Sequence, residues 1–205
     1  MRLATDAGGT FTDLVAFDEA SGAIVVGKAL TTPDDPSRGV LDALRQAEAA
    51  GAAAASVRFF VHGGTTVINA ITERKGAATA LVTTQGFRDV LAIGRGNRPD
   101  LYNLHAISPP PFVPRHLRFE LRERIDASGA VRTPLDEMAL AAIADRIAAA
   151  GVAAVAIALL HAYANPAHEA AAAAFLRARL PGVAVTASHE ISRQWREYER
   201  TNTAV

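Results

Sequence analysis

The sequence has no cysteine among its 205 residues. Disulfides, thiolate metal sites and a cysteine nucleophile are therefore excluded. Net charge is absent as well, because 21 lysine and arginine residues balance 21 aspartate and glutamate residues. Nothing therefore favours electrostatic capture of nucleic acid or of an anionic membrane. The longest apolar run, residues 151–160, has about half of the ~20 residues that a membrane span requires. We expect a cytoplasmic protein with no nucleic-acid or membrane partner.

What the sequence does have is a glycine-rich segment close to its start. Residues 6–13 read Asp-Ala-Gly-Gly-Thr-Phe-Thr-Asp, between two segments with β-strand character. Such a strand–turn–strand unit lets backbone N–H groups approach an anion, because glycine has no side chain. It lacks the lysine of a P-loop and the helix of a dinucleotide-binding turn. A phosphate-binding hairpin and an ordinary two-glycine hairpin both fit these residues.

A second candidate for phosphate binding follows a predicted strand at residues 57–61. Residues 62–69 read His-Gly-Gly-Thr-Thr-Val-Ile-Asn and lead from a loop into a helix that Gly76 closes. Free N–H groups at the start of that helix would face the loop. A capped helix with Thr65 as its N-cap explains the same pattern. Asn69, one turn into the helix, could reach the site or be solvated.

The order of predicted elements up to residue 84 is β-β-β-α-β-α-β. The first helix begins at Pro36 with Asp35 as its N-cap, and its buried stripe is predicted to be Val40, Leu41, Leu44 and Ala47. This order is typical of one lobe of the ribonuclease-H-like fold of actin-like ATPases, in which later strands join the sheet in parallel. We predict an α/β fold of this kind, with a mixed sheet, over residues 1–84.

The rest of the chain is predicted to form an insertion and an α/β remainder. Residues 85–132 read as loops with a half-exposed strand over residues 117–125, and residues 133–205 as helices and strands. The first helix of the remainder is predicted to begin with Thr133 as its capping residue. Four histidines share no metal-ligand spacing and are predicted to lie on the surface: His105, His116, His168 and His189.

Two polar segments outside the glycine-rich motifs are candidates for substrate binding. The first contains Arg95, Asn97, Arg98 and Asp100. Its two arginines could bind a carboxylate or phosphate bidentately, although a solvated surface loop has the same composition. The second contains His161 and Tyr163, which follow a buried strand where α/β proteins often carry function. An ordinary polar strand end fits them equally.

Long blocks spread over nearly the whole chain resemble the N-terminal region of the hydantoinase A / 5-oxoprolinase family, which includes the ATP-using subunit of acetone carboxylases. The blocks are residues 6–13, 62–76, 83–102, 159–166 and 196–203. One position departs from the family pattern, which reads His-Gly-Thr-Thr in the second block. Gly64 stands where the family has the first threonine, so a hydroxyl is lost there.

The resemblance implies ATP-dependent opening of a cyclic amide, such as 5-oxoproline or a hydantoin, with ATP and Mg²⁺ as cofactors. Asp6 and Asp13 would act near the metal or the attacking water. The other implied nucleotide-binding residues are Gly8, Gly9, Thr10, Thr12, His62, Gly63, Thr65, Thr66 and Asn69. The arginine-containing segment would bind the small-molecule substrate.

The resemblance also implies partners, because family members continue into a second, larger region, and a hydantoinase B-type subunit is a further candidate. We expect the 205 residues alone to bind ATP weakly or not at all, and to expose an apolar face where the missing region docks. Two alternatives stay open: a relict domain that only binds a partner, and a small-molecule kinase or activase of the actin-like ATPase fold.

Overall fold

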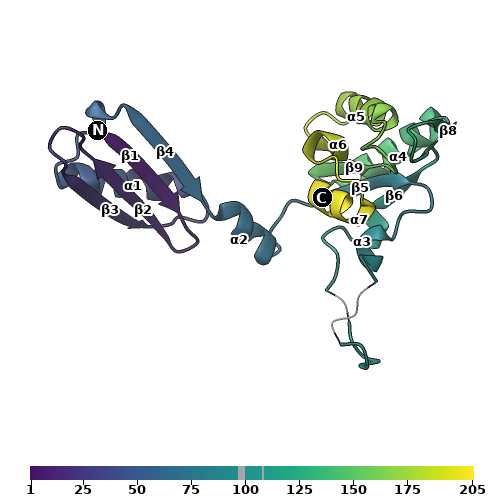
Figure 1. The fold of residues 1–205 in the computed structure, drawn as a ribbon, viewed down its shortest axis with the longest axis horizontal. Helices are drawn as coiled ribbons and strands as arrows, with labels where there is room; N and C mark the ends of the chain where they lie inside the picture. Colours follow the sequence, from purple (N-terminus) through teal and green to yellow (C-terminus); the bar gives the residue numbers. More distant parts are fainter. Residues whose placement is uncertain (97–99, 108) are drawn as a thin grey trace. The chain divides into compact units, whose positions relative to one another are not determined.

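The computed structural model describes residues 1–96, 100–107 and 109–205 and divides the chain into two compact units (Figure 1). The first unit is residues 1–76 and the second is residues 77–205. Each unit has its own sheet and its own apolar core. Within the described ranges, no helix is long and apolar enough to cross a membrane.

The first unit is a four-stranded sheet in the order β3-β2-β1-β4, with one face covered by helix α1. Its elements are β1 (Arg2–Ala7), β2 (Phe11–Phe17), β3 (Ile24–Leu30), α1 (Pro36–Ala49), the 3₁₀ turn η1 (Ala54–Ser56), β4 (Phe59–Gly64) and α2 (Thr66–Thr72). The first three strands form an antiparallel meander, and β4 joins β1 in parallel. Strict alternation along β1 and β2 buries Leu3, Leu14 and Ala16 against α1. The three-strand meander followed by a parallel strand is confirmed.

Helix α1 packs unusually close to the sheet. As predicted, it begins at Pro36, and the Asp35 carboxylate accepts a hydrogen bond from the Ser37 N–H (3.1 Å). A Cβ at Gly27 of β3 would lie only 2.2 Å from the Ala43 carbonyl oxygen. Only small side chains fit into such a contact. The predicted buried stripe is therefore partly wrong: Ala47 is buried, but Leu41 is 48% exposed.

The segment after β4 also differs from the prediction. The strand was expected to end at residue 61, but β4 continues through Gly64 because residues 62–64 pair with β1 in parallel. Thr65 directly precedes α2, the position that the capped-helix alternative gave it, but its side chain makes no capping hydrogen bond to the backbone of any described residue. Its hydroxyl accepts a hydrogen bond from the Asn69 side-chain amide (3.3 Å).

The second unit is built on a four-stranded parallel sheet in the order β10-β9-β5-β6. Residues on alternating sides of its strands enter two clusters, one with α4 and α5 and one with α3 and α7. Both faces of this sheet are therefore covered. Its elements are β5 (Thr79–Thr84), α3 (Val90–Ile93), η2 (Arg115–Leu117), β6 (Arg118–Leu121), β7 (Arg124–Ile125), β8 (Val131–Thr133), α4 (Glu137–Ala150), β9 (Ala154–Ala158), α5 (Ala167–Arg179), β10 (Ala184–Ala187), α6 (Ser188–Ile191) and α7 (Glu197–Ala204).

The assignment of β5 to the first sheet is wrong. Strand β5 is an inner strand of the second sheet, and the chain divides after residue 76 instead of after residue 84. Residues 80–84 are buried on both faces, which requires covering layers on both sides of the strand. Residue pattern alone does not reveal which of two sheets such a strand joins.

Two further predictions in this unit need correction. The strand expected to be half exposed is β6, in which Arg118, Phe119 and Leu121 are all buried. Thr133 ends β8, and the residue that caps α4 is Asp136, whose carboxylate accepts a hydrogen bond from the Ala139 N–H (2.9 Å).

Candidate functional site

The glycine turn between β1 and β2 is a closed and exposed loop. The Gly8 N–H donates to the Phe11 carbonyl (2.9 Å). Thr31 braces the turn, because its hydroxyl donates to the Gly8 carbonyl and its N–H to the Thr10 carbonyl, both at 2.9 Å. Among the described residues, no acceptor faces the N–H groups of Gly9 and Thr10, and both residues are exposed. The turn therefore presents two unused donors, which is the chemistry that an anion requires.

Thr12 does not belong to the exposed surface of this turn. It is fully buried, and its hydroxyl lies 3.0 Å from the Thr31 hydroxyl. Strand alternation places Thr12 on the face covered by α1, where a Cβ at Gly39 would lie 3.0 Å from its hydroxyl. The expectation that Thr12 contacts phosphate is corrected: its hydroxyl supports the turn from beneath.

The second glycine-containing segment lies directly beside the turn. The Thr65 N–H donates to the Ala7 carbonyl (3.0 Å). A Cβ at Gly9 would lie 2.9 Å from the Asn69 side-chain nitrogen, so the Asn69 amide lies against the turn. A Cβ at Gly64 would lie 3.3 Å from the same Ala7 carbonyl. A side chain at position 64 would therefore crowd β1, which is a local physical reason for glycine at the position where the family has threonine.

The two aspartates lie on the face of the sheet that α1 leaves open. Asp6 and Asp13 are paired across β1 and β2, and both side chains are exposed. The Lys28 ammonium lies 2.7 Å from Asp13. On the other side, Gly63 of β4 pairs with Asp6 and leaves its carboxylate uncrowded.

His62 lies on the opposite face from these aspartates. Its Nδ1 is 2.7 Å from the hydroxyl of Thr5, a buried residue on the α1 side. The structure therefore does not bring His62 together with Asp6 and Asp13. In the part of the chain that the structure describes, no three His, Cys, Asp or Glu side chains are grouped as metal ligands. Two carboxylates fit Mg²⁺, which usually takes one or two carboxylates together with phosphate and water oxygens.

The predicted substrate segment is only partly described. Arg95 forms an ion pair with Glu199 of α7, and the Tyr198 ring lies 3.6 Å from where a Cβ at Gly94 would stand. The Arg95 guanidinium is therefore engaged within the second unit, and Asp100 is exposed. Asn97 and Arg98 lie outside the described residues.

A buried polar cluster at the carboxyl end of β9 was missed by the sequence analysis. Arg200 is 1% exposed, and its guanidinium donates to the carbonyls of Leu159 (2.7 Å) and Gln194 (2.9 Å). Burial lowers the pKa of this guanidinium. The fully buried Glu169 accepts hydrogen bonds from the Leu159 N–H (2.9 Å) and the Ser188 hydroxyl (2.7 Å). The signal available in the sequence was a glutamate inside an alanine-rich helix.

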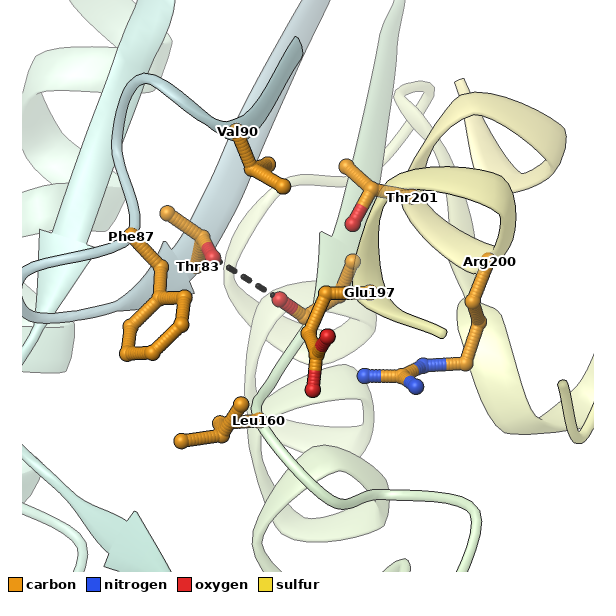
Figure 2. Close-up of a pocket in the computed structure, with 8 residues that line it drawn as sticks. Thr83, Phe87, Val90, Leu160, Glu197, Arg200 and Thr201 are labelled. Carbon is orange, nitrogen blue, oxygen red and sulfur yellow. Dashed lines mark hydrogen bonds between the residues drawn. The ribbon is translucent and has the colours of Figure 1, made fainter. Parts of the chain in front are cut away.

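A small pocket lies beside this cluster, between the ends of β5 and β9 and helix α7 (Figure 2). Figure 2 shows Arg200 and Glu197 on one side of it and Phe87 on the other, with the Thr83 hydroxyl bonded to the Ala158 carbonyl (2.9 Å). Its lining is Thr83, Phe87, Val90, Ala158, Leu160, Glu197, Arg200 and Thr201.

The prediction that all four histidines lie on the surface is wrong for two of them. His168 is buried, with Nδ1 2.8 Å from the carboxylate of the buried Glu123. His189 is largely buried, with Nδ1 2.5 Å from Glu169. A histidine can be buried together with a glutamate, because the hydrogen bond between them offsets the cost of burying either group.

His161 has an uncommon backbone. It adopts a left-handed conformation, with φ of 57°, and its ring packs edge-to-face with Tyr163 at 5.8 Å. Its Nδ1 is buried, and within the described ranges no hydrogen-bond partner reaches it.

These features define an α/β protein in which a mixed sheet with an exposed glycine turn precedes a separate parallel-sheet unit. Residues 2–180 match the sequence profile described as the hydantoinase/oxoprolinase N-terminal region. The chain belongs to this family, and the resemblance stated from its motifs is confirmed.

The relatives of this chain are much longer than it is. Caprolactamase subunit alpha of Pseudomonas jessenii is 39% identical over 211 residues, which cover all of this chain and 30% of that protein. The crystal structure of the ATP-dependent caprolactamase from the same organism superimposes with a TM-score of 0.87 at 39% identity, over all of this chain and 30% of the other. A nucleotide-free acetone carboxylase structure gives a TM-score of 0.89 at 31% identity, over all of this chain and 31% of the other. The chain therefore spans about a third of the length of these relatives.

Proposed function

We propose that residues 1–76 are the phosphate-binding part of an ATP-dependent enzyme that opens a cyclic amide. The observation that carries this proposal is the exposed turn at Gly9 and Thr10, which presents unused N–H donors directly beside Asn69. Asp6 and Asp13 are cross-strand neighbours on β1 and β2, and a single residue pair, Ala7 and Thr12, separates them from the turn. Support also comes from the P. jessenii relative, which is described as an ATP-dependent caprolactamase.

The opening of a cyclic amide requires activation by phosphoryl transfer, which explains the use of a phosphate-binding turn. An unstrained cyclic amide is a poor electrophile, and transfer of the terminal phosphoryl group of ATP to its carbonyl oxygen, with release of ADP, activates the ring carbon. Water then adds to this carbon, the ring C–N bond breaks as the nitrogen takes up a proton, and hydrolysis of the resulting acyl phosphate releases phosphate and the carboxylate. Catalysis of phosphoryl transfer consists mostly of positioning and charge neutralisation. The backbone N–H groups of Gly9 and Thr10 bind phosphate oxygens, and Asn69 and Thr65 border the same site. Asp6 and Asp13 would hold Mg²⁺, which neutralises phosphate charge when bound, or would orient the attacking water.

The remaining predicted residues have supporting or more distant roles in this proposal. Gly8 closes the turn, and Thr12 braces it through Thr31. Gly63 leaves space for the Asp6 carboxylate, and Thr66 is exposed at the start of α2. Arg95 and Asp100, with Asn97 and Arg98, are proposed to belong to the substrate end of the enzyme, where Arg95 would exchange Glu199 for a substrate carboxylate.

The proposal treats this chain as part of a larger nucleotide-binding machine. In this proposal the first unit serves as part of one lobe of an actin-like ATPase. The longer relatives carry about two thirds of their length outside the matched region. Relatives named as subunits also favour a partner chain. The 205 residues alone are then expected to bind Mg·ATP weakly or not at all.

A matched pair of glycine variants tests the proposal in the protein translated from the whole gene. Gly9→Ala places a methyl group 2.9 Å from the Asn69 amide and beside the proposed phosphate, whereas a methyl group at Gly76 meets nothing within 4 Å. Titration calorimetry with Mg·ATP is expected to show binding lost in Gly9→Ala and kept in Gly76→Ala. Equal binding by both variants would contradict the assignment of the turn.

The substrate class is tested separately by phosphate release. Caprolactam, 5-oxoproline, hydantoin and acetone are each added with ATP, and a cyclic amide is expected to stimulate phosphate release with opening of its ring. Stimulation by acetone alone would favour ketone carboxylation, which the similarity to acetone carboxylase supports as the second candidate. A stable phosphorylated product would instead indicate a small-molecule kinase. Hydrolysis of ATP by the 205 residues alone would refute the view that they are only part of the active enzyme.

A further inference from the structure

One face of the first sheet is apolar and open. Residues on this face alternate with the buried ones: Phe11, Val15 and Phe17 of β2, and Ile24, Val26 and Leu30 of β3. All six side chains are exposed, and Val26 is 68% exposed. Within residues 1–76, all of which the structure describes, α1 packs only on the opposite face. This patch is much more apolar than the surface of a typical soluble unit.

The edge of the same sheet is open as well. Strand β4 pairs on one side with β1, and it stands at the end of the strand order β3-β2-β1-β4. Every residue of β4 is exposed, including Phe59, Phe60 and Val61. A long apolar edge strand without a partner is a template for pairing with another strand.

A row of charged residues crosses this apolar surface near the glycine turn. Lys28, Asp13 and Asp6 form this row across β3, β2 and β1. The pair Phe11 and Leu30 lies on its turn side, and the pair Val15 and Val26 lies on its other side. The row contains the proposed magnesium ligands, so a segment docked on this face would lie beside the proposed phosphate site.

We propose that the open face and the β4 edge bind the region that follows residue 205 in the longer members of the family, with one strand of that region pairing with β4. The first unit is then a discontinuous domain, and residues 77–205 are inserted between its two parts. The choice of occupant rests on two observations. The matched relatives are about three times as long as this chain, and every described strand of residues 77–205 already belongs to that unit's own sheets.

Cysteine labelling tests the proposal, because the 205 residues contain no native cysteine. Val26→Cys places a thiol on the open face, and Glu48→Cys places one on exposed α1 as a matched control. Each variant is made in the 205-residue chain and in the protein translated from the whole gene, and maleimide modification of each peptide is followed by mass spectrometry without nucleotide. Circular dichroism checks that both variants fold.

In the 205-residue chain, both thiols are expected to react at similar rates. In the whole-gene protein, modification at residue 26 is expected to slow roughly tenfold or more, while residue 48 is unaffected. Amide hydrogen exchange of residues 59–64 should slow in the same protein, because strand pairing protects backbone N–H groups. No step depends on ATP, so this result is independent of the proposed activity.

Several outcomes would overturn the proposal. Equal labelling of residue 26 in both proteins would show that the downstream region does not cover the face. If the thiol at residue 26 already reacts slowly with maleimide in the 205-residue chain, the face is covered by residues 77–205. If light scattering then shows a dimer, the face is covered by a second copy. Unchanged amide hydrogen exchange over residues 59–64 would refute the strand pairing with β4. A reading frame that stops at residue 205 would refute the proposal, because the region proposed to cover the face would not exist.

Discussion

The close contact between α1 and β3 provides a sharp test of the structure. Replacing Gly27 with alanine would place a methyl group 2.2 Å from the Ala43 carbonyl oxygen, whereas ordinary contacts begin near 3.4 Å. The obstructing atom is backbone in the middle of a helix, so it cannot rotate away. Helix α1 would have to move from the sheet by more than 1 Å, and the fully buried Ala43 and Ala47 would lose contacts.

The magnitude follows from two opposing effects. Overpacking of a well-packed core costs about 1–3 kcal/mol, and this contact is shorter than most. Replacing glycine also reduces the conformational entropy of the unfolded chain, which raises the free energy of unfolding by about 0.4–1 kcal/mol. We therefore expect Gly27→Ala to lower the free energy of unfolding of the first unit by about 2 kcal/mol, which corresponds to a fall of about 10 °C in Tm for a unit of this size.

Thermal unfolding by circular dichroism, with hydrogen exchange of residues 24–49, measures this effect in the first unit. Gly76→Ala is the matched control, because a Cβ there meets nothing within 4 Å, and it should change stability by less than about 0.5 kcal/mol. If Gly27→Ala proves as stable as Gly76→Ala, the packing of α1 on β3 described here is incorrect.

Three further predictions concern charged residues. Asp6→Asn in the whole-gene protein is expected to lower substrate-stimulated phosphate release roughly 100-fold or more; unchanged release would exclude Asp6 from the site. Ser128→Ala is expected to raise the pKa of Asp126, which the Ser128 hydroxyl holds below its ordinary value of 3.8. Because folding lowers this pKa, the ionised Asp126 stabilises the folded state above about pH 4, and this stabilisation is lost as the pH falls further. An NMR titration of Asp126 in both proteins, with unfolding measured across the same pH range, checks the pKa and the stability. Arg200→Met removes the guanidinium that donates to the Leu159 and Gln194 carbonyls, which leaves the Leu159 carbonyl with the Ala162 N–H as its remaining donor, and should cost about 3 kcal/mol in urea unfolding. A loss below about 1 kcal/mol would contradict the buried cluster.

Local motifs in the sequence predicted local structure well. The glycine turn, its flanking strands and the Asp35 cap are each set by a few adjacent residues. The sequence left open whether Asn69 reaches the turn or is solvated, and the structure places its side chain beside Gly9, because β4 runs parallel to β1 and ends at the same edge of the sheet.

Burial of polar groups was predicted poorly. No motif in the sequence singled out Glu123, Glu169 or Arg200, yet all three are buried because distant partners satisfy them. Arg200 reaches the Leu159 carbonyl across 41 positions of sequence. No local pattern reports such a partner.

The sequence by itself determined the family, the α/β class and the glycine turn, because these depend on contiguous residues and on alternation along single elements. Only the tertiary structure decided that β5 belongs to a second sheet, that Thr12 is buried while Thr10 is exposed, and that one face and one edge of the first sheet are open. The physical reason is that strand pairing and side-chain burial are settled between segments far apart in the chain, where hydrogen-bond satisfaction and packing volume choose among arrangements that residue pattern leaves equal.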